Sequence, residues 1–183
     1  MKLLILCDRK SEETGLRKTL EEILNDNQTE VLGLDYQQFR PCIGCFGCWL
    51  KSPGTCLFND DPANELCAKE VNCDAVILLS EVTYGGYSAD IKAFLDRTIS
   101  NILPYFEIYR QEMHHKKRYA RFPNLFSIGY GDWTEEEKTI FTELNKRNAW
   151  NMQCVNYGVV TVKDNRELLE AAPEIHALLR GEN

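Results

Sequence analysis

The chain has 183 residues, 44% of them hydrophobic and 27% charged, and its formal net charge at pH 7 is -7. This length suits one domain with a real core, and we expect a single domain over residues 1–183. The acidic balance excludes nucleic acid as a partner, because neutralising phosphates requires a basic surface.

The first apolar run covers residues 3–7 and ends at Asp8. It is too short for a signal segment or a membrane span, so we expect a cytoplasmic protein that does not bind membranes. Its thiols are then reduced or metal-bound.

Short apolar runs alternate with helical patterns along the chain, which is typical of strands buried on both faces of a parallel sheet. Strands are expected at 3–7, 31–34, 75–79, 125–128 and 159–162. Helices are expected at about 12–25, 62–71, 90–102, 134–150 and 165–180. This alternation predicts a three-layer α/β/α sandwich, flavodoxin-like, with a five-stranded parallel sheet of order 2-1-3-4-5.

Helix starts carry recognisable signals. Asp61 before Pro62 predicts an N-cap, and Thr134 with Glu137 predicts a capping box. In the predicted strand order a ligand binds between the first and third strands, beyond their carboxyl ends. Residues 8–14, 81–87 and 129–133 should line that crevice.

A cysteine-rich loop, about 41–60, reads PCIGCFGCWLKSPGTC in its first part. The spacing C-x2-C-x2-C-x7-C allows one loop to surround a single metal ion or an iron–sulfur centre, and reduced thiols are the alternative. The candidate ligands are Cys42, Cys45, Cys48 and Cys56. An all-cysteine site suits zinc or iron.

The segment TYGGYSADIKAFLDR covers residues 83–97. Its glycine pair would let backbone N–H groups approach a flat ligand, and its tyrosines would stack on an aromatic ring or pack against its edge. An ordinary glycine turn before an amphipathic helix explains the same pattern.

Together these segments resemble the flavodoxin-like NAD(P)H-dependent oxidoreductases, the group of NADPH-dependent FMN reductases and iron–sulfur flavoproteins. The resemblance implies that the isoalloxazine of FMN contacts Tyr84, Gly85, Gly86 and Tyr87. It also implies a [4Fe-4S] cluster on the four loop cysteines, and association as a homodimer or homotetramer.

The stretch CDRKSEETG departs from the glycine-serine-x-arginine phosphate loop of that group, since Asp8, Glu12 and Glu13 would repel a phosphate. The helix N-terminus and nearby cations favour an anion, so we assign the FMN phosphate to Arg9, Lys10, Ser11 and Thr14. The far edge of the flavin is assigned to Gly129, Tyr130, Gly131 and Asp132, although the same residues would also make a plain turn.

A long basic and aromatic loop is expected at about 104–123. Its basic island, residues 114–118, suits the phosphates of NAD(P)H or an acidic edge of a partner subunit, and a solvated loop is the alternative.

The function favoured is an FMN-dependent oxidoreductase that passes hydride from NAD(P)H to flavin and on to a small-molecule or protein acceptor, with [4Fe-4S] as a further centre. Two alternatives remain. One is a relative that has lost flavin and serves as a metal-binding or scaffold protein, and the other is a receiver-like regulatory domain built around Asp8 and Lys163.

Overall fold

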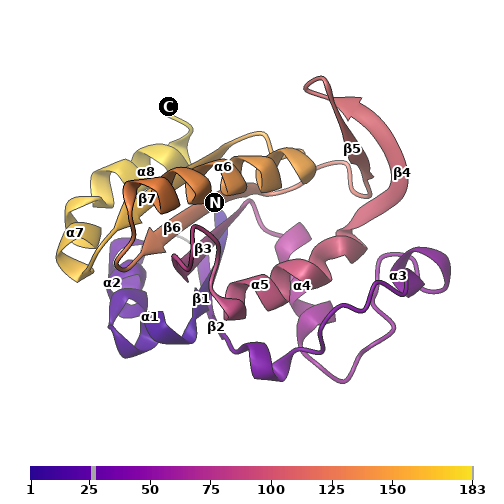
Figure 1. Ribbon diagram of the computed structural model, residues 1–183, viewed down its shortest axis with the longest axis horizontal. Helices are drawn as coiled ribbons and strands as arrows, with labels where there is room; N and C mark the ends of the chain where they lie inside the picture. Colours follow the sequence, from indigo (N-terminus) through magenta and orange to yellow (C-terminus); the bar gives the residue numbers. More distant parts are fainter. Residues whose placement is uncertain (26–27, 183) are drawn as a thin grey trace.

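The computed structural model describes residues 1–25 and 28–182. Within them, five parallel strands form the central sheet in the spatial order β2-β1-β3-β6-β7 (Figure 1). The strands are β1 (Lys2–Asp8), β2 (Gln28–Leu34), β3 (Ala75–Glu81), β6 (Asn124–Tyr130) and β7 (Tyr157–Val162). Numbered as parallel strands alone, this is the order 2-1-3-4-5, so the predicted topology is confirmed.

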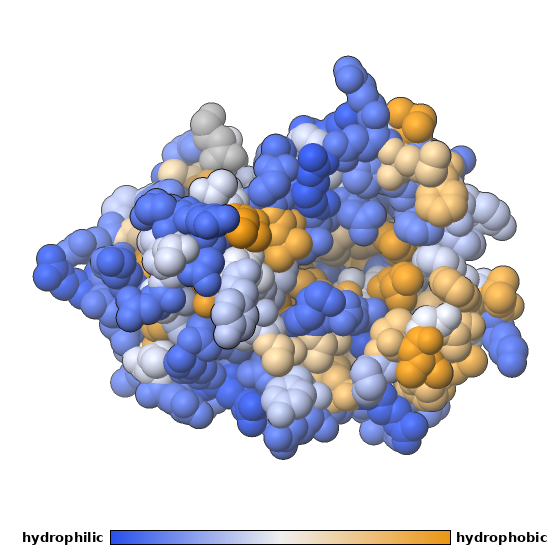
Figure 2. Space-filling model, viewed as in Figure 1, coloured by the Kyte–Doolittle hydropathy of each residue, from blue (hydrophilic) through white to orange (hydrophobic). Residues whose placement is uncertain are grey.

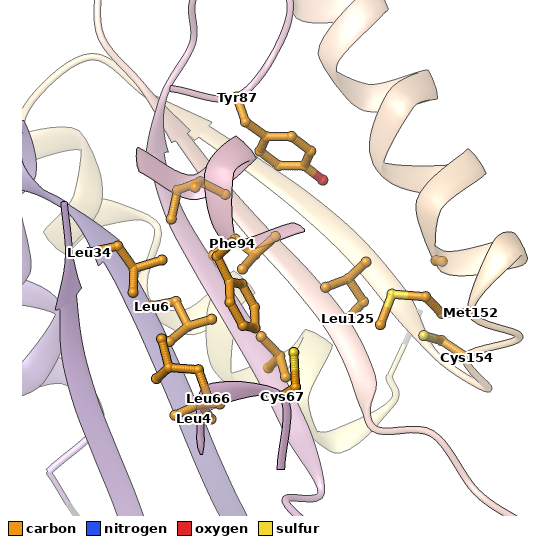
Figure 3. Packing of buried hydrophobic residues seen from close by; sticks show 14 of the residues in the cluster. Leu4, Leu6, Leu34, Leu66, Cys67, Tyr87, Phe94, Leu125, Met152 and Cys154 are labelled. Atoms are coloured by element: carbon orange, nitrogen blue, oxygen red, sulfur yellow. The ribbon is translucent and has the colours of Figure 1, made fainter. Parts of the chain in front are cut away.

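Helices cover both faces of this sheet, which gives the three layers. One face carries α4 (Ala63–Val71), α5 (Ala89–Arg97) and α6 (Glu135–Asn151), and the other carries α2 (Leu16–Ile23), α7 (Asn165–Glu170) and α8 (Ala172–Arg180). Alternate residues of β1 serve the two cores: Leu4 and Leu6 pack towards α4 and α5, as Figure 3 shows around Phe94, while Leu3 and Ile5 pack towards α2. This two-sided burial explains the unbroken apolar runs.

Two of the predicted helices are interrupted. The helix expected at about 12–25 is split into α1 (Arg9–Glu13) and α2 by Gly15, whose φ of 79° is left-handed. The helix expected at 165–180 is split at Ala171, just before the proline at the start of α8. The helix expected at 90–102 ends earlier, at Arg97, and a 3-10 turn, η2 (Thr98–Asn101), follows it.

The segment predicted as a long loop at about 104–123 instead contains an antiparallel hairpin, formed by β4 (Ile102–Tyr109) and β5 (Glu112–Lys117). In Figure 1 the hairpin projects from the sandwich on the side of α5. Its two-residue turn places Arg110 (φ 51°) and Gln111 (φ 66°) in the left-handed region. Both residues are poor signals for such a turn, which usually contains Asn or Gly, so the sequence did not reveal it.

The capping box of Thr134 and Glu137 at α6 is confirmed. At α4 the Oδ1 atom of Asp61 accepts the N–H of Ala63 at 3.0 Å, although the N-cap position itself falls on Pro62. In the part of the chain that the structure describes, the helices are too short or too polar to traverse a lipid bilayer.

Candidate functional site

The cysteine loop leaves β2 through the 3-10 turn η1 (Tyr36–Gln38) and contains one short helix, α3 (Gly47–Leu50). It brings its four cysteines to a single pocket. The residues lining that pocket are Cys42, Ile43, Gly44, Cys45, Phe46, Cys48, Cys56, Phe58, Arg97 and Ile99. The predicted ligand set is therefore brought together, although the four thiols differ in exposure: Cys48 is buried and Cys42 is exposed.

Local backbone chemistry shapes this loop. Gly44 (φ 65°) and Phe46 (φ 55°) adopt left-handed conformations that turn the chain sharply between the cysteines. A Cβ at Gly47 would lie 2.4 Å from Cδ1 of Leu57, so a larger residue there would have to displace that leucine. At the far end, Asn64 accepts the N–H of Cys56 at 2.9 Å and donates to its carbonyl at 3.0 Å. The Cys56 end of the motif is thus held by two hydrogen bonds to a residue of α4.

Arg97, from the last turn of α5, lies beneath this pocket and is 2% exposed. Its Nη1 donates to the carbonyl of Arg40 at 2.7 Å and to Asp61, and its Nη2 donates to the carbonyl of Phe58 at 3.2 Å. Burial alone would raise the pKa of Asp61, but hydrogen bonds, the largest from Arg97, lower it below its usual range. Among the described residues, Nε of Arg97 is buried without a hydrogen-bond partner.

The chemistry of the four thiols limits what the pocket can hold. Burial, followed by the charges of the other three cysteines, raises the pKa of Cys48, so four thiolates need a positive guest or neighbour. No group of three or more His, Cys, Asp or Glu residues closes on a single metal ion within residues 1–25 and 28–182. Four thiols in the lining of one largely apolar pocket, with the Arg97 guanidinium beside them, are a donor set that either zinc or an iron–sulfur cluster accepts.

The sequence patterns do not single out Arg97 as a functional residue. The signal available is its position at the end of the amphipathic helix pattern, where an arginine on the buried side needs a partner. Nothing in the local pattern indicates that this partner is the cysteine loop.

The crevice expected to hold FMN lies at the other half of the same sheet edge, between β1 and β3. Asp8 ends β1 and is 1% exposed. One of its carboxylate oxygens accepts the N–H of Ser11 at 3.0 Å and the hydroxyl of Tyr130 at 2.6 Å, and the other accepts the N–H of Glu81 at 2.7 Å. Burial, followed by the nearby Asp8 carboxylate, raises the pKa of Tyr130. Asp8 therefore occupies the start of α1 with its own negative charge.

A second buried carboxylate, Asp90 of α5, completes this arrangement. It accepts the N–H of Arg9 at 3.1 Å and the N–H of Tyr36 at 2.8 Å. The predicted phosphate ligands are consequently engaged within the protein. Arg9 lies between Asp35 and Asp90, and Lys10 pairs with Glu81. Ser11 and Thr14 direct their hydroxyls to backbone carbonyls, those of Asp8 for Ser11 and of Lys10 and Ser11 for Thr14.

The tyrosine-glycine loop closes through two hydrogen bonds between Thr83 and Gly86, at 3.0 and 2.8 Å. Tyr84 at its tip is 90% exposed. Gly85 (φ 75°) packs on α6, because a Cβ there would lie 2.8 Å from Cβ of Ile140. Tyr87 is buried, with its hydroxyl donating to Oδ1 of Asn145 at 2.7 Å, and burial raises the pKa of Tyr87 to about 12. Thr83 and Tyr84 therefore face solvent, whereas Gly85 and Tyr87 are buried.

The glycines at the end of β6 and just after it also have structural roles. A Cβ at Gly129 would lie 2.6 Å from a ring carbon of Phe141, so this glycine allows helix α6 to approach the sheet. Gly131 turns the chain with a φ of 111°, and Asp132 is exposed. The basic island is also used structurally: Arg118 donates to the carbonyls of Ser100 and Ile102, and thereby fastens the base of the hairpin.

The residues present after β1 do not fit a phosphate. The backbone N–H groups of Arg9 and Ser11 already donate to Asp90 and Asp8, and the added charge would face these two buried carboxylates. The assignment of the flavin ring to the loops at 84–87 and 129–132 stays a prediction.

Comparison with known proteins supplies the family. Residues 1–126 match the model of the family described as NADPH-dependent FMN reductase. An iron–sulfur flavoprotein of Methanocaldococcus jannaschii is 37% identical over 84 residues, which cover 45% of this chain and 42% of that protein. The match thus spans less than half of that relative.

Solved structures share the fold at low identity. An FMN-dependent NADH-azoreductase from Bacillus anthracis, in complex with FMN, has a TM-score of 0.56 and 14% identity, with both chains covered completely. An NADPH-quinone reductase from P. pentosaceus has a TM-score of 0.60 and 12% identity, covering 96% of this chain and 97% of that one. These neighbours are flavodoxin-like sandwiches of the kind described above. Because the family model spans more than two thirds of the sequence, the chain belongs to the NADPH-dependent FMN reductase family.

Proposed function

We propose that the protein is an NAD(P)H-dependent oxidoreductase that reduces a flavin and passes electrons to a second acceptor, with a [4Fe-4S] centre on Cys42, Cys45, Cys48 and Cys56. The observation that carries this proposal is the convergence of the four cysteines on one pocket that contains the buried Arg97. Family membership supports the nicotinamide donor and the flavin. It also favours an oxidoreductase over a receiver-like domain.

When bound, an iron–sulfur cluster supplies one-electron transfer at a potential set by its surroundings. The residues of this chain would tune that potential. Arg97 would place its positive charge beside the cysteine sulfurs, and Asp61 would offset part of that charge. The apolar side chains of Phe46 and Ile99 would limit the access of water to the cluster.

The cluster is tested by anaerobic purification and reconstitution, followed by iron and acid-labile sulfide analysis. About four iron and four sulfide per chain, with broad absorbance at about 400 nm, are expected. Cys45→Ser should lose most of the iron, while Cys154→Ser, which alters a buried cysteine outside the loop, should keep it. One zinc per chain without sulfide, or full iron in Cys45→Ser, would contradict the assignment.

The reductase activity is tested by anaerobic oxidation of NADH and NADPH with a flavin as acceptor. A rate above that of the flavin alone is expected with at least one of the two donors. No rate with either donor contradicts the enzymatic part of the proposal and leaves the cluster assignment to be judged by iron content.

We further propose a homodimer or homotetramer. Exposed apolar side chains gather on the hairpin and the cysteine loop, and Figure 2 shows them on one side of the molecule. They are Ile43, Phe46, Leu50, Leu57, Tyr105, Phe106, Ile108 and Met113. Large exposed apolar patches mark association surfaces.

The oligomeric state is tested with two variants of exposed apolar residues. Ile108→Asp should lower the mass measured by light scattering, whereas Leu169→Asp, at an exposed leucine of α7, should not. A monomeric wild-type protein would contradict the proposed association.

A further inference from the structure

The backbone N–H groups at the seam between β1 and β3 come from three separate segments of the chain. Those of Arg9 and Ser11 follow β1, that of Tyr36 follows β2 and that of Glu81 ends β3. Together they form the kind of converging donor set that binds phosphate groups at a sheet edge. In this protein, all four donate to the side chains of Asp8 and Asp90, called the seam carboxylates below.

Charge at the seam also disfavours a phosphate. Asp8, Asp35, Glu81 and Asp90 carry four negative charges, whereas Arg9 and Lys10 carry two positive charges and are paired with three of those acids. A phosphomonoester would add a charge of about -1.5 to -2 to a region that is already negative. It would also have to displace Asp8 from three hydrogen bonds, one of them to the buried Tyr130 hydroxyl.

We infer that the seam carboxylates replace the FMN phosphate as the anion at this edge, so that the protein selects flavins by the ring and ribityl chain and gains nothing from the terminal phosphate. Asp8 and Asp90 are then specificity-determining residues, and riboflavin is bound at least as well as FMN. This inference rests on the proposed flavin reductase function and specifies its flavin.

The first test uses the unmodified protein, with and without its reconstituted iron. Riboflavin and FMN are titrated separately, and binding is followed by quenching of flavin fluorescence. The dissociation constant of riboflavin should be equal to or lower than that of FMN. An FMN affinity that is ten or more times that of riboflavin would overturn the inference while leaving the proposed function intact.

The second test uses variants at the seam. Asp8→Ser frees the N–H groups of Ser11 and Glu81 and removes a charge, so FMN should bind at least ten times more tightly than to the wild type, with riboflavin affinity changed less than threefold. Asp8→Asn keeps the size of the side chain and serves if the serine variant does not fold; it should raise FMN affinity in the same direction. Glu65→Ser, at an exposed acid of α4, is the control and should leave both affinities unchanged.

Circular dichroism confirms the fold of each variant. Equal gains for both flavins, or no gain for FMN in a folded variant, would overturn the inference. If neither flavin binds to any form, the flavin part of the proposed function fails together with the inference, and the iron content still reports separately on the cysteine pocket.

Discussion

The cysteine pocket and the seam between β1 and β3 each contain a buried charged side chain, Arg97 in the pocket and Asp8 at the seam. At the seam the backbone donors meet the carboxylates of Asp8 and Asp90, and the buried charge of Asp8 has three hydrogen bonds. In the cysteine pocket the Nε of Arg97 has no partner within the described chain, and four thiols surround apolar side chains. The four backbone donors at the seam thus have carboxylate partners within the protein, whereas one buried donor at the cysteine pocket has none among the described residues.

The largest expected effect concerns the buried ion pair beneath the cysteine pocket. Arg97→Met should lower the free energy of unfolding by about 3–5 kcal/mol, because Asp61 is left buried without its partner. Urea unfolding measures this. Arg166→Met, which breaks an exposed pair with Glu170, should change the stability by less than about 0.5 kcal/mol. A small loss in Arg97→Met would show that the pair does not anchor the loop.

Glu70 of α4 is another buried carboxylate, and it accepts from one side-chain donor, Asn101, whereas Asp8 accepts from three donors. Burial raises the pKa of Glu70 from 4.5 to about 7. The folded protein therefore binds a proton more tightly than the unfolded chain, and stability falls as the pH rises from about 4.5 to 7, by up to about 3 kcal/mol.

Glu70→Gln should remove that dependence, so the variant should be more stable than the wild type at pH 8 and similar to it at pH 4. Unfolding curves across this range measure the difference. Glu65→Gln, at an exposed position of the same helix, should keep the wild-type profile. A wild-type profile in Glu70→Gln would mean that Glu70 is not the titrating group.

At the seam, Tyr130→Phe removes one of the three hydrogen bonds to Asp8 and nothing else of comparable size. The free energy of unfolding should fall by about 1–3 kcal/mol, since a buried carboxylate loses a donor. Tyr105→Phe, on the exposed hairpin, should be neutral within about 0.5 kcal/mol. Thermal and urea unfolding distinguish the two, and equal stability of both variants would mean that Asp8 does not depend on this hydroxyl.

The smallest expected effect is a difference in stability between alanine variants of the two glycines of the tyrosine-glycine loop. Gly85→Ala should cost about 1–2 kcal/mol, because its φ is 75° and its Cβ would meet Ile140 at 2.8 Å. Gly86→Ala should cost less than about 0.5 kcal/mol, since its Cβ would lie 3.4 Å from the carbonyl oxygen of Thr83. The reverse order would mean that the loop is held at Gly86 and not by packing on α6.

Several features of the protein follow from the amino-acid sequence alone. Five short, continuous apolar runs that alternate with helical patterns predict the parallel sheet and its order, because right-handed crossovers leave few arrangements. Thr134 and Glu137 predict their capping box, because that motif is formed by residues three positions apart. The cysteine spacing likewise predicts a common pocket, since all four thiols belong to one short loop.

The tertiary structure decided which groups separated in sequence would meet. The sequence indicates that Asp8 repels a phosphate, but the contacts of Asp8 with Glu81 and Tyr130 depend on strands β3 and β6, which lie 73 and 122 positions further along the chain. Arg97 meets the cysteine loop because α5 packs beside it, and the hairpin depends on an unusual Arg110-Gln111 turn. Sequence patterns predict helices and caps because the hydrogen bonds of these elements join residues close in sequence. The partner of a buried charge is instead set by the packing of the whole domain.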